Sequence, residues 1–209
     1  RFVMVIAFPC TIGLAVLGEP IFLLLFPGTA QTAPMAAMMM YVGAFAVVFY
    51  AMSTLSNGLL QGINRMRIPV TNAAISLVAH VILLVILMLF FHLKIYAVVI
   101  ANMFFALMMC VMNSMAIRKY SGYKQEVIKT FVIPAISSVI MGIITWLFYH
   151  GCHALLKSNA ISTILAIMIA AIVYAVTLLL FKGLSEEEIL RFPKGALLVR
   201  IAKKLHLLR

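Results

Sequence analysis

The chain has 209 residues, of which 66% are hydrophobic and 10% are charged, and its mean hydropathy is +1.18. A soluble domain is about half apolar and about a quarter charged, so this composition excludes an ordinary soluble domain and indicates an integral membrane protein. The formal net charge is +11. No basic run interleaved with aromatic residues lies in a water-exposed region, so we do not expect nucleic acid as a partner.

Six long apolar runs follow one another along the chain, and each supplies the roughly 20 residues that a helix needs to cross a bilayer. The sequence therefore predicts an all-α fold, a polytopic membrane helix bundle with six transmembrane helices. Pro9 and Pro20 interrupt the first run, and two kinks are expected there because proline removes a backbone hydrogen bond. The expected helices cover Phe2–Phe26, Pro34–Gln61, Pro69–Phe91, Ile95–Ile117, Ile128–His150 and Asn159–Phe181.

The chain changes character after the sixth run, from Lys182 to Arg209. Ser185 and Glu188 have the spacing of a capping box, which predicts the start of a short helix. Further on, apolar residues recur at helical spacing while cations occupy the other faces. This pattern predicts a C-terminal basic amphipathic helix on the inner leaflet. The alternative is a binding site for a partner protein.

The cations are distributed unevenly between the gaps that separate the runs. Fourteen of the sixteen Lys and Arg residues lie at the two chain ends, in alternate gaps or, for Lys129, at the edge of such a gap, and only Lys94 and Lys157 fall in the other gaps. The positive-inside rule then predicts that both ends of the chain are cytoplasmic. Arg65 and Arg67 lie in a short inner loop and are candidates for contact with phosphate or a lipid headgroup. The fourteen inner cations are Arg1, Arg65, Arg67, Arg118, Lys119, Lys124, Lys129, Lys182, Arg191, Lys194, Arg200, Lys203, Lys204 and Arg209.

Polar residues inside three consecutive runs are spaced so that each run has one polar face. Residues four apart, or eleven apart, lie on the same side of a helix. Polar groups are costly in hydrocarbon unless they face a bundle interior or a wet cavity, so converging faces predict a hydrophilic cavity that contacts substrate. Interhelical hydrogen bonds are the alternative for each residue. The candidates are Ser53, Asn57 and Gln61 in the second run, Asn72, Ser76 and His80 in the third, and Asn102 and Asn113 in the fourth.

Glu19 is the one acidic residue within an apolar run. It is a candidate for coupling transport to an ion, and an interfacial position in contact with outer water is the alternative. The chain has five acidic residues and no Asp, so none of the six apolar runs carries paired carboxylates and the sequence has no Asp-rich metal motif. We expect neither an enzyme nor a cofactor, and no catalytic or metal-binding residue is assigned. The three cysteines match neither a metal motif nor a disulfide framework.

Three short sequence stretches, taken in their order along the chain, carry a resemblance to a known family. They are Leu17-Gly18-Glu19-Pro20-Ile21, the stretch Leu59-Leu60-Gln61-Gly62-Ile63-Asn64-Arg65-Met66-Arg67-Ile68-Pro69, and Leu184-Ser185 followed by Leu190-Arg191-Phe192-Pro193-Lys194-Gly195. With these landmarks the chain resembles the C-terminal portion of the polysaccharide biosynthesis and lipid II flippase family. The similar branch is the stage V sporulation protein B-like flippases, within the MATE-like MOP superfamily.

The resemblance implies a membrane transporter of fourteen helices in two lobes. Residues 1–117 would be four helices of the C-terminal lobe, residues 118–181 a further pair that forms a groove for a lipid tail, and residues 182–209 the cytoplasmic tail. The implied function is to flip undecaprenyl-diphosphate-linked saccharides, the precursors of peptidoglycan or polysaccharide in the cell wall, across the bacterial plasma membrane by alternating access.

The partners that the resemblance implies are the lipid-linked saccharide, membrane lipids and a missing N-terminal lobe of the same protein. The chain departs from the family in two respects. The cations that hold the diphosphate in lipid II flippases lie mostly in the first lobe, and relatives often have lysine at the position of His80. A cation-coupled multidrug exporter of the same superfamily is the alternative function.

Overall fold

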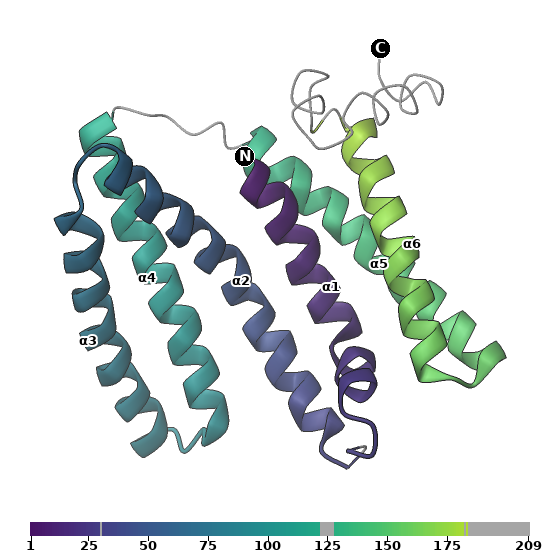
Figure 1. Cartoon of the computed structure of the whole chain (residues 1–209). Helices are drawn as coiled ribbons and strands as arrows, with labels where there is room; N and C mark the ends of the chain where they lie inside the picture. Colours follow the sequence, from purple (N-terminus) through teal and green to yellow (C-terminus); the bar gives the residue numbers. More distant parts are fainter. Residues whose placement is uncertain (30, 122–127, 182, 184–209) are drawn as a thin grey trace. The chain divides into compact units, whose positions relative to one another are not determined.

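The computed structural model describes residues 1–29, 31–121, 128–181 and 183. Over these ranges the chain is helical with connecting turns and has no strand, as predicted (Figure 1). The predicted tail helix lies outside the described residues. The helices are α1 (Phe2–Leu25), α2 (Ala33–Gly62), α3 (Arg67–Leu89), α4 (Ile95–Ser121), the short π-helix η1 (Ile128–Val132), α5 (Ile133–Leu156) and α6 (Asn159–Leu180).

The chain divides into two compact units, and we describe each one by itself. The four-helix unit, Phe2–Gln125, contains α1 to α4. The hairpin unit, Glu126–Arg209 together with Arg1, contains η1, α5 and α6.

Helix α1 is kinked at one of its two prolines. Leu17 has non-helical dihedral angles, φ −106° and ψ 16°, three residues before Pro20. Pro20 cannot donate a backbone hydrogen bond to the preceding turn, which explains the break at this point. No residue around Pro9 has non-helical dihedral angles, so the helix is not broken at that proline.

The four-helix unit is a row in which α2 packs between α1 and α4, and α4 packs between α2 and α3 (Figure 1). Gly18 permits the close approach of α1 to α2, because a Cβ atom there would lie 3.2 Å from Tyr41 Cε1 and 3.3 Å from Met40 Cβ. Helix α3 is at the edge of the row, and its buried residues are Pro69, Asn72 and Ser76.

Helix α3 has the reverse of the pattern that a soluble protein would show. Its buried face carries Asn72 and Ser76, whereas Val70, Val78 and Ile82 are among its exposed residues. Water would penalise such an arrangement, but lipid does not, because acyl chains are as apolar as these side chains. The edge helix therefore packs through its polar face and leaves its apolar faces free for lipid.

The hairpin unit packs α5 against α6 largely through small and weakly polar side chains. The buried positions include Ser137, Ser138 and Thr145 on α5 and Ala166 and Ala170 on α6. Small residues let two helix backbones approach closely, which is how membrane helices associate without a hydrophobic driving force. At the end near the turn, the Tyr149 hydroxyl donates a hydrogen bond of 2.8 Å to Asn159 Oδ1.

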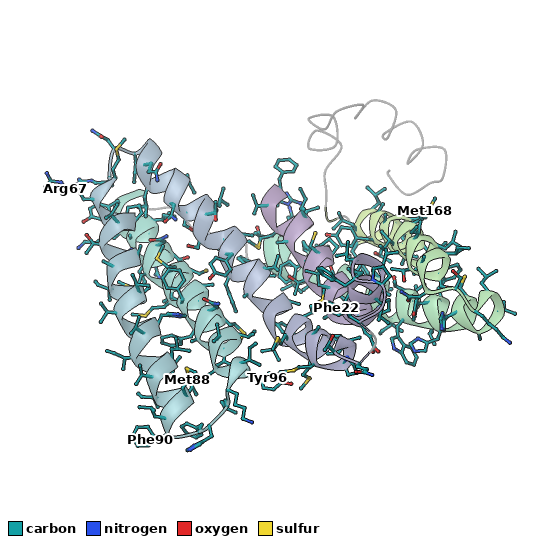
Figure 2. All side chains as sticks on the ribbon, turned by 60° about the horizontal axis from the view of Figure 1, so that its bottom comes forward. Phe22, Arg67, Met88, Phe90, Tyr96 and Met168 are labelled. Carbon is teal, nitrogen blue, oxygen red and sulfur yellow. The ribbon has the colours of Figure 1, made fainter. Side chains whose placement is uncertain are left out.

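All six helices are long and apolar enough to cross a membrane. Large apolar side chains are exposed on every one of them, for example Phe45 on α2 and Leu147 on α5. Figure 2 labels another of them, Met168 on α6. Exposed apolar surface of this extent is foreign to a soluble monomer. The structure therefore fits a multi-pass membrane protein.

Candidate functional site

Three asparagines from three different helices form one hydrogen-bonded cluster in the four-helix unit, which we call the asparagine cluster. Asn72 Nδ2 on α3 donates to Asn113 Oδ1 on α4 over 2.8 Å. Asn113 Nδ2 in turn donates to Asn57 Oδ1 on α2 over 2.6 Å. Asn113 is 0% exposed and Asn72 is 8% exposed, whereas Asn57 is only half-buried.

Hydroxyl and thioether groups continue the buried polar face around this cluster. Ser76, one turn after Asn72, is 3.8 Å from Met112 Sδ through its Oγ. Ser53, one turn before Asn57, is buried. The neighbouring Ser56 is also buried and donates a hydrogen bond of 2.7 Å to the Met52 carbonyl of its own helix. Further buried hydroxyl groups therefore lie within one helical turn of the asparagines along α2 and α3, and Ser56 was not among the predicted site residues.

His80 extends the polar face of α3 by one more turn. Its ring meets Phe105 of α4 edge to face, with centroids 5.9 Å apart, and Phe105 also contacts Tyr50 of α2 at 6.4 Å. The His80 Nδ1 atom is buried and has no hydrogen-bond partner among the described residues. His80 thus joins the same three helices as the asparagine cluster, but through aromatic contacts.

Two predicted residues lie away from this cluster. Gln61 is exposed in the last turn of α2, and Asn102 is exposed on α4. Asn102 differs from Asn113 in burial, although the eleven-residue spacing places the two on one face of α4, because the buried positions of α4 mostly follow a four-residue repeat. The buried positions in this repeat are Ala97, Ala101, Met109, Asn113 and Ile117, and Ala106 is buried outside it. A ridge of residues four apart is inclined to the helix axis, so Ala101 rather than Asn102 occupies it at this level.

Glu19 lies at a different place in the unit, just after the kink of α1. It is half-buried, and it is near enough to Tyr41 of α2 for an electrostatic interaction. The same tyrosine ring packs over Gly18. The carboxylate is therefore placed at the α1–α2 interface and away from the asparagine cluster.

Arg65 and Arg67 are exposed in the turn between α2 and α3 and at the first residue of α3. The Arg65 guanidinium lies over the Tyr120 ring of α4, with Cζ 4.7 Å from the ring centroid. Tyr120 was not predicted, because a contact between this turn and the end of a distant helix leaves no spacing signal in the sequence.

An apolar groove runs along the face of α2 that includes Gly58 and Gly62. Its volume is about 730 Å³, and Val3 of α1 contributes to its wall. Neither glycine has an atom within 4 Å of the position that a Cβ would occupy, so the groove is open at these residues. The remaining lining residues are Ala51, Thr54, Leu55, Leu59 and Ile63.

No group of three or more His, Cys, Asp or Glu side chains that could hold a metal ion is found among the described residues. Protein-family models, curated proteins and solved structures were compared with the chain, and none matches.

The chemistry of this site is that of neutral amides in an apolar span. Each amide has a carbonyl acceptor and two N–H donors, and the two hydrogen bonds of the cluster use only part of this capacity. Asn57 is the member that is open to its surroundings, so its remaining donors are the ones that a bound polar group can reach. The arrangement suits recognition of hydroxyl and phosphate oxygens by hydrogen bonds.

Proposed function

We propose that this chain is part of a transporter that flips undecaprenyl-diphosphate-linked saccharides across the bacterial plasma membrane by alternating access. Both ends of the chain face the cytoplasm in this proposal, and a first lobe of the same protein supplies the cations that hold the diphosphate. The proposal rests on the resemblance of the Leu59–Pro69 stretch to the flippase family and on the asparagine cluster.

The asparagine cluster is the observation that carries the proposal. Polar side chains at membrane depth are rare and commonly mark the path of a substrate or ion. Asn57 keeps part of its amide accessible while Asn72 and Asn113 hold it through hydrogen bonds. An uncharged amide fits a saccharide, whose hydroxyls both donate and accept, and it also donates to phosphate oxygens.

The two-unit organisation supports the same proposal. The resemblance implies four helices of a lobe followed by a helix pair that contacts a lipid tail, and the chain consists of a four-helix unit and a hairpin. The faces of α5 and α6 that point away from their mutual contact carry exposed apolar residues such as Ile143, Leu147 and Ile172. Such faces are suited to contact with a polyprenyl chain.

The test is transfer of a fluorescent undecaprenyl-diphosphate disaccharide between the leaflets of proteoliposomes, read as protection from a membrane-impermeant quencher. The protein is expressed from its complete reading frame. Transfer above that of empty liposomes is expected. Asn57→Leu should slow transfer by about ten- to a hundredfold, because a hydrogen bond to a charged group contributes about 1.5–3 kcal/mol and each 1.36 kcal/mol is about tenfold in rate. Asn102→Leu is the matched control, and it should transfer at the wild-type rate.

Absence of transfer above empty liposomes would refute the proposal. Equal slowing by Asn57→Leu and Asn102→Leu would refute the role given to the asparagine cluster.

A cation-coupled multidrug exporter of the same superfamily is the second candidate. The observation that favours it is the half-buried Glu19 carboxylate beside Tyr41, because an acidic group within a membrane helix can carry a proton or cation. Glu19→Gln keeps the shape of the side chain and removes its charge. If this candidate is right, drug efflux and its dependence on the ion gradient are both lost in the variant. Unchanged efflux removes the support for it.

A further inference from the structure

Four cations gather at one end of the four-helix unit, where α2 ends, α3 begins and α4 ends. They are Arg65, Arg67, Arg118 and Lys119, and all four are exposed. Figure 2 shows Arg67 at this end of α3 and Phe90 at the opposite end. We call this set, together with Tyr120, the basic cluster.

The backbone of the turn fixes where Arg65 lies. Asn64 adopts the left-handed conformation, with φ 58°. The Asn64 N–H donates to the Gln61 carbonyl over 3.0 Å, and the Arg65 N–H donates to the Leu60 carbonyl over 2.8 Å. These two bonds are the Schellman motif that closes a helix C-terminus. Arg65 is therefore attached to a well-defined helix end and not to a free loop.

One aromatic ring brings two of these cations together. The Arg65 Cζ atom is 4.7 Å from the Tyr120 ring centroid, and the Lys119 Nζ atom is 5.7 Å from the same centroid. Both distances are within the roughly 6 Å over which a cation is attracted to a ring face. Two like charges thus lie around one ring, and an anion that binds beside the ring would offset their mutual repulsion.

No carboxylate among the described residues neutralises this cluster. The one acidic residue that the structure describes is Glu19. Glu19 is near the C-terminal end of α1, whereas Val3 near its N-terminal end lines the apolar groove together with Ile63 of the turn that carries Arg65. At 1.5 Å per residue, Glu19 is about 24 Å along α1 from Val3, well beyond the screening length of about 8 Å in physiological salt. The C-terminal dipoles of α2 and α4 offset only about half a charge each.

Apolar side chains lie directly beside the cations. Ile63 and Met66 flank Arg65 in the turn, and Val70 follows Arg67 by one turn. Met66 is 62% exposed and Val70 is 69% exposed. A ligand that fits this surface has an anionic group at the ends of the helices and an apolar part alongside them. Free phosphate has the first property only, whereas an anionic phospholipid has both.

We propose that the basic cluster is a binding site for an anionic phospholipid, whose phosphate lies between Arg65 and Lys119 beside the Tyr120 ring. Arg67 and Arg118 add charge at the rim, and the acyl chains lie along the exposed apolar residues of α2 and α3. The site is separate from the asparagine cluster and is independent of whether the protein transports saccharides.

The test measures phospholipid binding by the whole purified protein in detergent, by native mass spectrometry and by thermal stabilisation on addition of phosphatidylglycerol or phosphatidylcholine. The wild type should retain and be stabilised by phosphatidylglycerol in preference to phosphatidylcholine. Removing each cation should weaken this binding about fivefold, so Arg65→Gln combined with Lys119→Gln should weaken it about thirtyfold. Tyr120→Leu leaves the charges in place and should weaken it about two- to fivefold.

Two controls make the result decisive. Lys94→Gln removes one exposed cation from the turn at the opposite end of α3 and should leave binding unchanged. Inorganic phosphate should not displace the lipid at equal concentration. Equal binding of the two lipids, equal loss in Lys94→Gln, or unchanged binding in the double variant would each overturn the proposal. Displacement of the lipid by inorganic phosphate would show a site for soluble phosphate and would also overturn it.

Discussion

Replacing Asn113 by alanine should destabilise the four-helix unit more than any other single change in the asparagine cluster. Asn113 is the central member, and its loss removes both hydrogen bonds at once. Hydrogen bonds between membrane helices contribute about 0.6 kcal/mol on average and at most about 1.7 kcal/mol. Two of them give about 1.2–3.4 kcal/mol, and the short distances of 2.8 and 2.6 Å favour the upper part of this range.

The amides that lose their partner in Asn113→Ala add to the loss in the free energy of unfolding. Asn72 is 8% exposed, so without Asn113 its amide is left unpaired in an apolar environment. An unsatisfied buried polar group costs about 1–3 kcal/mol, although this partly overlaps with the lost hydrogen bond. We expect Asn113→Ala to lower the free energy of unfolding by about 2–3 kcal/mol. Asn57→Ala and Asn72→Ala, which each remove one bond, should cost about half as much.

The assay is equilibrium unfolding in mixed micelles, followed by far-ultraviolet circular dichroism, for the single variants and the Asn72/Asn113 double variant. The double variant should be about 0.6–1.7 kcal/mol more stable than the sum of the single losses predicts, because the shared bond is counted twice. Asn102→Ala, an exposed asparagine on the same helix, should change stability by less than about 0.5 kcal/mol. A loss for Asn113→Ala no larger than that of Asn102→Ala would refute the reasoning.

Three further predictions concern the backbone of the turns and helix ends, each measured as a change in unfolding free energy. Gly183→Ala should destabilise the hairpin unit by about 1–3 kcal/mol. The new Cβ atom would lie 2.9 Å from both the Leu178 carbonyl oxygen and Ile133 Cγ2. Unchanged stability would contradict this packing. Asn64→Gly should be tolerated, whereas Asn64→Val should lower the free energy of unfolding by about 1–2 kcal/mol. The left-handed conformation of Asn64 suits glycine and asparagine and not a β-branched residue. Equal stability of the two variants would contradict this backbone conformation. Lys157→Gly should stabilise the hairpin by about 0.5–1 kcal/mol, because Lys157 closes α5 with φ 51°; a loss of stability would show that the lysine side chain outweighs the backbone.

The helices could be predicted from the sequence because hydropathy acts on each segment separately. The run Pro69–Phe91 became α3, Arg67–Leu89, with bounds shifted by two residues. The kink before Pro20 follows from the chemistry of proline alone. Pro9 also lacks a backbone N–H, yet the residues around it keep helical dihedral angles. A proline therefore marks where a helix can break, and the packing around it decides whether it does.

The site was predictable only in part, because a polar face says nothing about what covers it. Spacing placed Asn57, Asn72 and Asn113 on polar faces of three helices, and in the structure two hydrogen bonds join their side chains. Spacing also grouped Asn102 with Asn113. The inclination of the buried ridge on α4 separates the two, and this inclination depends on the angle at which neighbouring helices cross. The contact of Arg65 with Tyr120 is likewise a consequence of packing.

The asparagine cluster can hold helices together and can also bind substrate, and these two roles predict different relations between stability and transport. Replacing all three asparagines by leucine leaves no amide of the cluster unpaired. When all partners of a buried hydrogen-bonded group are replaced together by apolar side chains of similar size, the free energy of unfolding can change very little. If the cluster only joins α2, α3 and α4, the triple variant keeps transport in proportion to its folded fraction. If the amides contact the saccharide or the diphosphate, as proposed, transport is lost while stability remains. The ratio of transport to folded protein, and neither quantity by itself, therefore distinguishes a packing device from a substrate site.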